Sequence, residues 1–150
     1  MTENAKVLVV ANRTAESPEL LDALRARVVR GPCEFTLLVP ATPHGLAWAA
    51  DRSSGSAEAE RHREAFEEAL REEGIPLKET KVGDGDPLAA IADECNFTSY
   101  HELIVSTLPT KLSRWLRLDL PRKAQAATGL PVTHVVGHEV KAGAVKAGAR

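Results

Sequence analysis

The sequence predicts one α/β domain built on an open, parallel, five-stranded sheet. Two patterns support this fold class. Short apolar runs recur along the chain, and each is followed by a segment whose apolar residues repeat at helical spacing. Strands that alternate with helices form parallel units with right-handed crossovers, and helices then cover both faces of the sheet. A chain of 150 residues without internal repeats fits a single domain with a sizeable core.

The first half of the chain supplies two strands and a helix. Residues 5–11 (AKVLVVA) form an unbroken apolar run, which is typical of a strand covered on both faces. Ser17-Pro18 is a helix-start signal, and Gly31-Pro32 ends that helix. Residues 33–39 (CEFTLLV) predict the second strand. The polar connection that follows, residues 40–56, is long enough to be functional or mobile.

The next elements begin with a helix over residues 57–74, whose apolar stripe includes His62. Residues 75–82 alternate apolar and polar side chains, which indicates an edge strand. A turn then leads to Asp86, the N-cap of a helix whose apolar stripe includes Cys95.

The last part of the chain supplies two more strands. Residues 102–106 (ELIVS) predict the fourth strand, and Leu116, Leu118 and Leu120 lead into a last helix that ends near Gly129. Residues 131–136 (PVTHVV) predict the fifth strand. We therefore expect an α/β domain over residues 1–136 and a flexible C-terminal tail over residues 137–150, which are rich in Gly, Ala and Lys.

The composition excludes several classes of protein. The net charge is −2 and aromatic residues make up 4%, so neither a nucleic-acid footprint nor a stacking surface is present. No apolar run approaches the roughly 18 residues of a membrane span, and the N-terminus lacks signal-peptide features. We expect a cytoplasmic protein without membrane or nucleic-acid partners, in which Cys33 and Cys95 are buried free thiols.

The familiar catalytic and metal-binding motifs are absent from the sequence. It contains no dinucleotide-binding glycine fingerprint, no phosphate-binding P-loop and no nucleophile elbow. His134 and His138 lie four residues apart in a strand context, which separates them by about 13 Å, too far for a shared metal. Turn chemistry and helix capping account for Asp84 and Asp86. No catalytic residue and no metal site is therefore predicted.

The candidate ligand site lies where the strand order would reverse. In open parallel sheets, ligands bind there, beyond the carboxyl ends of the strands. If the first strand is central and the fourth lies beside it, this point joins residues 12–16 to the segment 106–121 (STLPTKLSRWLRLDLP). In that segment Ser113 caps a short helix, and Lys111 and Arg114 add the charge of a small-anion site. The alternative is a solvated helix start in which Trp115 and Leu116 serve as packing anchors.

Residues 5–136 resemble the universal stress protein family. The resemblance rests on VLVV with its polar turn, VGDGDPLAAIADEC, ELIVST with its basic loop, and GLPVTHVV, in this order. It implies an adenine nucleotide alpha hydrolase-like sheet of strand order 3-2-1-4-5, a cytoplasmic location, and homodimers joined through the last strand.

The nucleotide motif of that family is altered in this chain. Nucleotide-binding members carry Gly-x-x-Gly, nine residues, then Gly-Ser/Thr after the fourth strand. Here Ser106, Pro109 and Asp119 stand at the glycine positions, and Leu120 stands at the hydroxyl position. Pro109 lacks an N–H, and Asp119 would repel a phosphate. Asn12 stands where such members usually place an Asp near the adenine.

The expected function is therefore a non-catalytic binding or regulatory domain with a degenerate nucleotide site for AMP, phosphate or sulfate. The candidate ligand-binding residues are Ala11, Asn12, Arg13, Val39, Pro40, Ser106, Thr107, Lys111, Ser113 and Arg114. One alternative is an ATP-binding stress protein with an atypical loop. Two others are a small enzyme related to nucleotidylyl transferases and a flavodoxin-type module, and the first loop lacks the phosphate motif that each requires.

Overall fold

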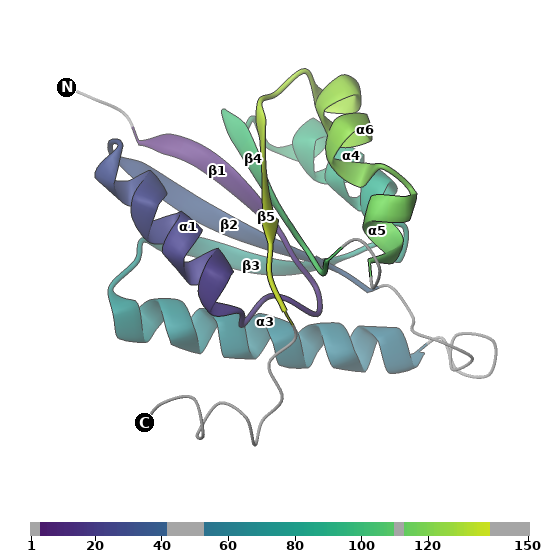
Figure 1. The fold of residues 1–150 in the computed structure, drawn as a ribbon, viewed down its shortest axis with the longest axis horizontal. Coiled ribbons are helices and arrows are strands. Elements are labelled where there is room, and N and C mark those ends of the chain that lie inside the picture. Colours follow the sequence, from purple (N-terminus) through teal and green to yellow (C-terminus); the bar gives the residue numbers. More distant parts are fainter. Residues whose placement is uncertain (1–3, 42–52, 110–112, 139–150) are drawn as a thin grey trace.

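A computed structural model describes residues 4–41, 53–109 and 113–138 of the chain. Its centre is a sheet of five parallel strands in the order β3-β2-β1-β4-β5 (Figure 1). The strands are β1 (Ala5–Val10), β2 (Cys33–Pro40), β3 (Leu77–Gly83), β4 (Glu102–Thr107) and β5 (Val132–Val136). The helices are α1 (Pro18–Val29), α3 (Ser53–Glu73), α4 (Pro87–Phe97), α5 (Arg114–Arg117) and α6 (Leu120–Thr128). The predicted fold class and strand order are confirmed.

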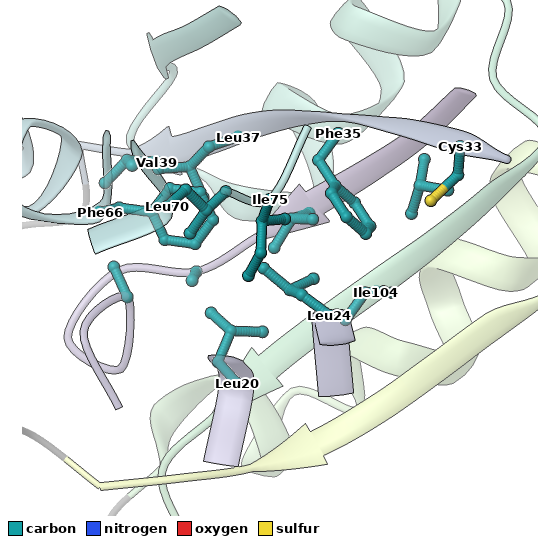
Figure 2. Packing of buried hydrophobic residues seen from close by; sticks show 14 of the residues in the cluster. Leu20, Leu24, Cys33, Phe35, Leu37, Val39, Phe66, Leu70, Ile75 and Ile104 are labelled. Carbon is teal, nitrogen blue, oxygen red and sulfur yellow. The ribbon is translucent and has the colours of Figure 1, made fainter. Parts of the chain in front are cut away.

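Helices cover both faces of the sheet. Side chains alternate between faces along a strand, so Val7 and Val9 of β1 point towards α1 and α3, while Leu8 and Val10 point towards α4 and α6. Figure 2 shows the first of these cores, in which α1 and α3 pack against β2. Because β1 is buried on both faces, its sequence is an unbroken apolar run.

The predicted helix starts are confirmed by their capping hydrogen bonds. The Ser17 hydroxyl accepts from the backbone N–H of Leu20 at 3.2 Å. The Asp86 carboxylate accepts from the N–H of Leu88 at 3.1 Å, and Asp84 accepts from the N–H of Asp86 at 2.8 Å. These bonds supply partners for backbone donors that a helix start leaves unpaired.

The short helix expected after Ser113 and the last helix expected to end near Gly129 are both present. α5 ends at Arg117, and Asp119 has a left-handed backbone with φ of 58° before α6 begins at Leu120. Pro121 explains why α5 and α6 are separate helices. Proline has no N–H to donate, and in a continuous helix its ring would clash with the carbonyl of the residue four positions earlier.

The starts of α3 and β3 differ from the predicted starts. α3 begins at Ser53 rather than at residue 57, so part of the predicted connection 40–56 is helical, while residues 42–52 lie outside the described part of the chain. β3 begins at Leu77 rather than at residue 75, because the N–H of Ile75 still donates to the Leu70 carbonyl at the end of α3. As expected of an edge strand, β3 is only partly covered.

The two cysteines are free, as predicted, but only Cys33 is fully buried. Cys95 is half-buried because α4 turns Ala90, Ile91 and Glu94 towards the core instead. Glu94 tolerates this position because Lys81 and the Tyr100 hydroxyl bind its carboxylate.

The chain continues in an ordered path just beyond β5. Gly137 is buried and its N–H donates to the Thr107 carbonyl at 2.8 Å, while His138 lies 3.1 Å from a carboxylate oxygen of Glu19. The rest of the predicted tail, residues 139–150, lies outside the described residues. Across the described residues, none of the helices has the length and apolar character needed to span a bilayer.

Candidate ligand site at the carboxyl ends of β1 and β4

The strand order reverses between β1 and β4. From β1 the chain adds β2 and β3 on one side of the sheet, and β4 and β5 occupy the other side (Figure 1). The segment after β1 leads to α1 on one face, whereas the segment after β4 leads to α5 on the opposite face. This is the predicted location of the candidate site.

Asn12, the second residue after β1, presents an unpartnered acceptor. The side chain is 6% exposed, and its Nδ2 donates to the Pro40 carbonyl at the end of β2. Because a carbonyl can only accept, this bond fixes the orientation of the amide. Oδ1 is then buried and has no hydrogen-bond partner in the described part of the chain. Leaving such an atom unpaired costs about 1–3 kcal/mol, so this position is suited to a donor from a ligand.

The loop that carries Asn12 is fastened to β4. The hydroxyl oxygens of Thr14 and Ser106 lie 2.6 Å apart, and both residues are buried. Within the loop, Ala15 N–H donates to the Asn12 carbonyl and Ser17 N–H donates to the Thr14 carbonyl. The hydrogen bonds therefore hold Asn12 in place beside the end of β4.

Thr107 belongs to the β4–β5 pairing rather than to an open site. Its hydroxyl donates to the Leu108 carbonyl at 2.9 Å and lies 2.8 Å from Nε2 of His134. The Thr107 hydroxyl proton is already donated to Leu108, so the imidazole of His134 must donate from Nε2 to the Thr107 oxygen. Desolvation lowers the pKa of His134, which favours the neutral ring.

The segment after β4 contains the predicted cap and a packing anchor. The Ser113 hydroxyl accepts from Leu116 N–H at 3.0 Å, and Trp115 is buried against the core on the α4 and α6 face. Arg114 is exposed, and Lys111 lies outside the described residues. Both the helix start and the packing role expected for Trp115 are present, whereas the anion site stays a prediction.

The remaining candidates surround the ends of β1 and β2. Ala11 is buried, and its N–H donates to the Leu38 carbonyl at 3.2 Å. Val39 is a buried core residue, and Arg13 is half-buried in the loop. Of the ten candidates, Asn12 and Pro40 are joined directly by a hydrogen bond.

Sequence reasoning missed three residues that shape this region: Thr14, Glu16 and His62. Thr14 and Glu16 follow Asn12 in the same loop, and His62 of α3 lies 3.0 Å from Glu16. The sequence contains a signal for one of these three residues, because His62 is a titratable residue within the apolar stripe of a helix.

The histidines and acids do not assemble a metal centre within the ranges that the structure describes. His134 contacts Thr107, and His138 contacts Glu19. Asp84 and Asp86 are engaged in the turn and the helix cap.

The structure is an α/β domain of five parallel strands, and the candidate ligand site lies at the switch point of its sheet. No family model matches the sequence, and no curated protein matches it. Solved structures do. A universal stress protein from Archaeoglobus fulgidus has a TM-score of 0.61 at 16% identity, covering 89% of this chain and 99% of that one.

Two further structures contain a nucleotide. The Archaeoglobus fulgidus protein in complex with dAMP has a TM-score of 0.58 at 17% identity, covering 90% of this chain and 99% of that one. A universal stress protein family protein from Arabidopsis thaliana with AMP bound has a TM-score of 0.59 at 16% identity, covering 89% and 92%. The chain therefore has the universal stress protein fold.

Proposed function

We propose that the chain is a non-catalytic binding domain of the universal stress protein type, which holds a nucleoside monophosphate at the switch point. The observation that carries the proposal is the buried Oδ1 of Asn12, which has no hydrogen-bond partner among the described residues. An amino group or hydroxyl group of a nucleoside supplies the missing donor. The dAMP and AMP in the similar structures are ligands of this class.

The phosphate end of the ligand is expected to be held weakly. Pro109 offers no N–H, and the N–H of Asp119 already donates to the Leu116 carbonyl at 3.0 Å. Arg114 and, by sequence, Lys111 are the positive charges that we expect to face the phosphate. Binding a triphosphate 1,000-fold more tightly requires roughly 4 kcal/mol of additional interaction energy. We therefore expect AMP to bind, and ATP to bind no better, without dependence on magnesium and without hydrolysis.

Calorimetry with AMP, ATP and inorganic phosphate tests this function. We expect Asn12→Ala to weaken AMP binding about tenfold, the effect of losing one well-placed hydrogen bond. Asn96→Ala is the matched control, because Asn96 is exposed on α4. Tight, magnesium-dependent ATP binding would contradict the degenerate site. Failure of AMP and phosphate to bind would contradict the binding function altogether.

The same proposal includes a homodimer and a cytoplasmic location. β5 is an edge strand whose side chains Thr133, His134 and Val136 are exposed, and pairing with a second copy would cover that edge. The free thiols Cys33 and Cys95 are compatible with a reducing compartment.

A further inference from the structure

The chain just beyond β5 packs against the loop that carries Asn12. The N–H of Gly137 donates to the Thr107 carbonyl at 2.8 Å, so the pairing of β5 with β4 continues one residue past the strand. Gly137 also lies against Ser17, where the loop after β1 ends and α1 begins (Figure 1). Gly137 therefore lies between the end of β4 and the end of this loop.

Lack of space limits position 137 to glycine. Gly137 is buried, and a Cβ atom added to it would overlap the Ser17 hydroxyl and lie 3.0 Å from the Ser17 Cβ. Carbon atoms in van der Waals contact are normally about 3.5–4.0 Å apart. The backbone of Gly137 is not left-handed, so its conformation alone does not require glycine. A side chain at this position would therefore displace Ser17 or the exit of β5.

Ser17 cannot move without disturbing the loop. It is 0% exposed, its hydroxyl accepts from the N–H of Leu20 at 3.2 Å, and its own N–H donates to the Thr14 carbonyl at 3.0 Å. In the same loop, the N–H of Ala15 donates to the Asn12 carbonyl at 3.2 Å. Through these two overlapping turns, a shift of Ser17 also shifts Asn12 and its buried Oδ1.

We propose that Gly137 is a positioning residue for the ligand site, because the exit of β5 braces the loop and thereby sets the place of Asn12. The contact between Thr14 and Ser106 holds the middle of the loop to β4, and Gly137 holds its end beside β5. The edge strand thus contributes to ligand binding through the loop. This inference rests on the proposed function, in which Asn12 accepts a hydrogen bond from the ligand.

Amide hydrogen exchange tests the brace without any ligand. In Gly137→Ala, we expect the protection factor of the Ala15 amide to fall about tenfold, because the added methyl group displaces Ser17 and loosens the turn. Combining Gly137→Ala with Ser17→Gly removes both Ser17 atoms that the methyl group would meet, and glycine is accepted at a helix N-cap. Ala15 protection in this double variant should return to its value in Ser17→Gly alone.

Gly129→Ala is the matched control, because Gly129 precedes β5 at the opposite end of the strand. Gly129 has a left-handed backbone with φ of 73°, and no described atom lies within 4 Å of a Cβ added there. Alanine is strained in that conformation and lowers stability, but it does not touch the loop. The Ala15 amide should be protected as in the wild type. Equal protection in the wild type and Gly137→Ala, or equal loss in both glycine variants, overturns the proposal.

AMP affinity supplies the second readout, because a glycine needed only for stability would not change the Kd of the folded protein. Calorimetry is performed at a temperature where near-ultraviolet circular dichroism shows that every variant is folded. We expect Gly137→Ala to weaken the Kd about fivefold, which is part of the tenfold effect of losing the whole Asn12 hydrogen bond. The double variant should recover the Kd of Ser17→Gly.

The outcomes separate the brace from the proposed function. If AMP does not bind but Ala15 protection falls in Gly137→Ala and recovers in the double variant, the brace is supported and the nucleotide function fails. If AMP binds equally to the wild type and Gly137→Ala, the positioning role is wrong and the function stands. Should Gly137→Ala fail to fold, the double variant decides: values equal to those of Ser17→Gly support the proposal, and different values overturn it.

Discussion

The hydroxyl oxygens of Thr14 and Ser106 lie 2.6 Å apart, although 92 residues separate them in the sequence. Both residues are almost completely buried, at 2% and 1% exposure. The contact joins the loop after the central strand to the end of its neighbour β4. It thereby holds the loop at the edge of the sheet where Oδ1 of Asn12 has no hydrogen-bond partner among the described residues.

The first prediction concerns this pair. Ser106→Ala leaves the buried Thr14 hydroxyl without its partner and should lower the free energy of unfolding by about 1–2 kcal/mol. Thr14→Val should have an effect of similar size. Because the two changes remove the same hydrogen bond, the double variant should lose about 1 kcal/mol less than the sum of the single losses. Urea denaturation measures all three, and strictly additive losses would show that the two hydroxyls are not coupled.

The second prediction concerns the ion pair between Arg27 of α1 and Glu102 of β4. Their side chains are 10% and 15% exposed, and Nε of Arg27 lies 2.9 Å from the carboxylate. Arg27→Leu leaves the nearly buried carboxylate of Glu102 without its charged partner and should destabilise the fold by about 3 kcal/mol. Arg27→Leu combined with Glu102→Leu should recover much of that loss, since neither charge is then left unpaired.

An exposed pair on the same helix provides the control for that prediction. Arg25 and Asp22 are in contact, but their side chains are 44% and 74% exposed. Asp22→Ala should therefore change the unfolding free energy by less than about 1 kcal/mol. Thermal denaturation compares the two pairs, and equal losses from Arg27→Leu and Asp22→Ala would contradict the role of burial.

The third prediction is a loss of stability at alkaline pH that depends on Tyr100. Burial raises the pKa of the Tyr100 hydroxyl, and its hydrogen bond to the Glu94 carboxylate raises the pKa further. Above the ordinary value of 10.0, the unfolded chain releases the phenol proton while the folded chain keeps it. The folded state then binds more protons than the unfolded state, so stability is full below that pH and falls as the pH rises.

Tyr100 is the single tyrosine of the chain, so phenolate absorbance reports on this residue alone. The absorbance should appear only well above pH 10 and in step with unfolding. In Tyr100→Phe, the alkaline fall in unfolding free energy should be smaller than in the wild type. A phenol that ionises at its ordinary pKa in the folded protein would show that the contact with Glu94 is wrong.

The fourth prediction separates the two thiols. Burial raises the pKa of both Cys33 and Cys95, which lowers the fraction of reactive thiolate in each. Cys33 is 4% exposed, whereas Cys95 is half-buried on the flank of α4. In the native protein an alkylating reagent should modify Cys95 first, as measured by mass spectrometry of the labelled peptides. Faster labelling of Cys33 would contradict its place in the core.

The fifth prediction concerns association through β5. Light scattering at micromolar concentration should give twice the chain mass of 16.1 kDa. Val136→Asp places a charge on the exposed edge and should shift the protein towards the monomer. Phe97→Asp is the control, because Phe97 is also apolar and is more exposed than Val136, at 80% against 46%, but contacts Lys81 of β3, on the opposite edge of the sheet. A wild type that remains monomeric would refute the dimer.

Much of the fold is determined locally and was therefore predictable from the sequence. An unbroken apolar run such as β1 reports burial on both faces, and Ser17-Pro18 and Asp86-Pro87 mark helix starts through bonds that span two or three residues. The alternation of such elements is sufficient for a parallel α/β sheet. Pro121 is a further local signal, because proline is tolerated in the first turn of a helix and α6 begins at Leu120.

The candidate site depends on contacts between distant segments, and only the tertiary structure decided them. The sequence placed Asn12 after a central strand, but the bond to Pro40 that orients its amide comes from another strand. Likewise, no local pattern assigns Ser106 to Thr14, or His62 to Glu16. Hydrogen bonds are short and directional, so they depend on the relative positions of packed elements to within a fraction of an ångström, whereas burial patterns depend only on which face of an element is covered.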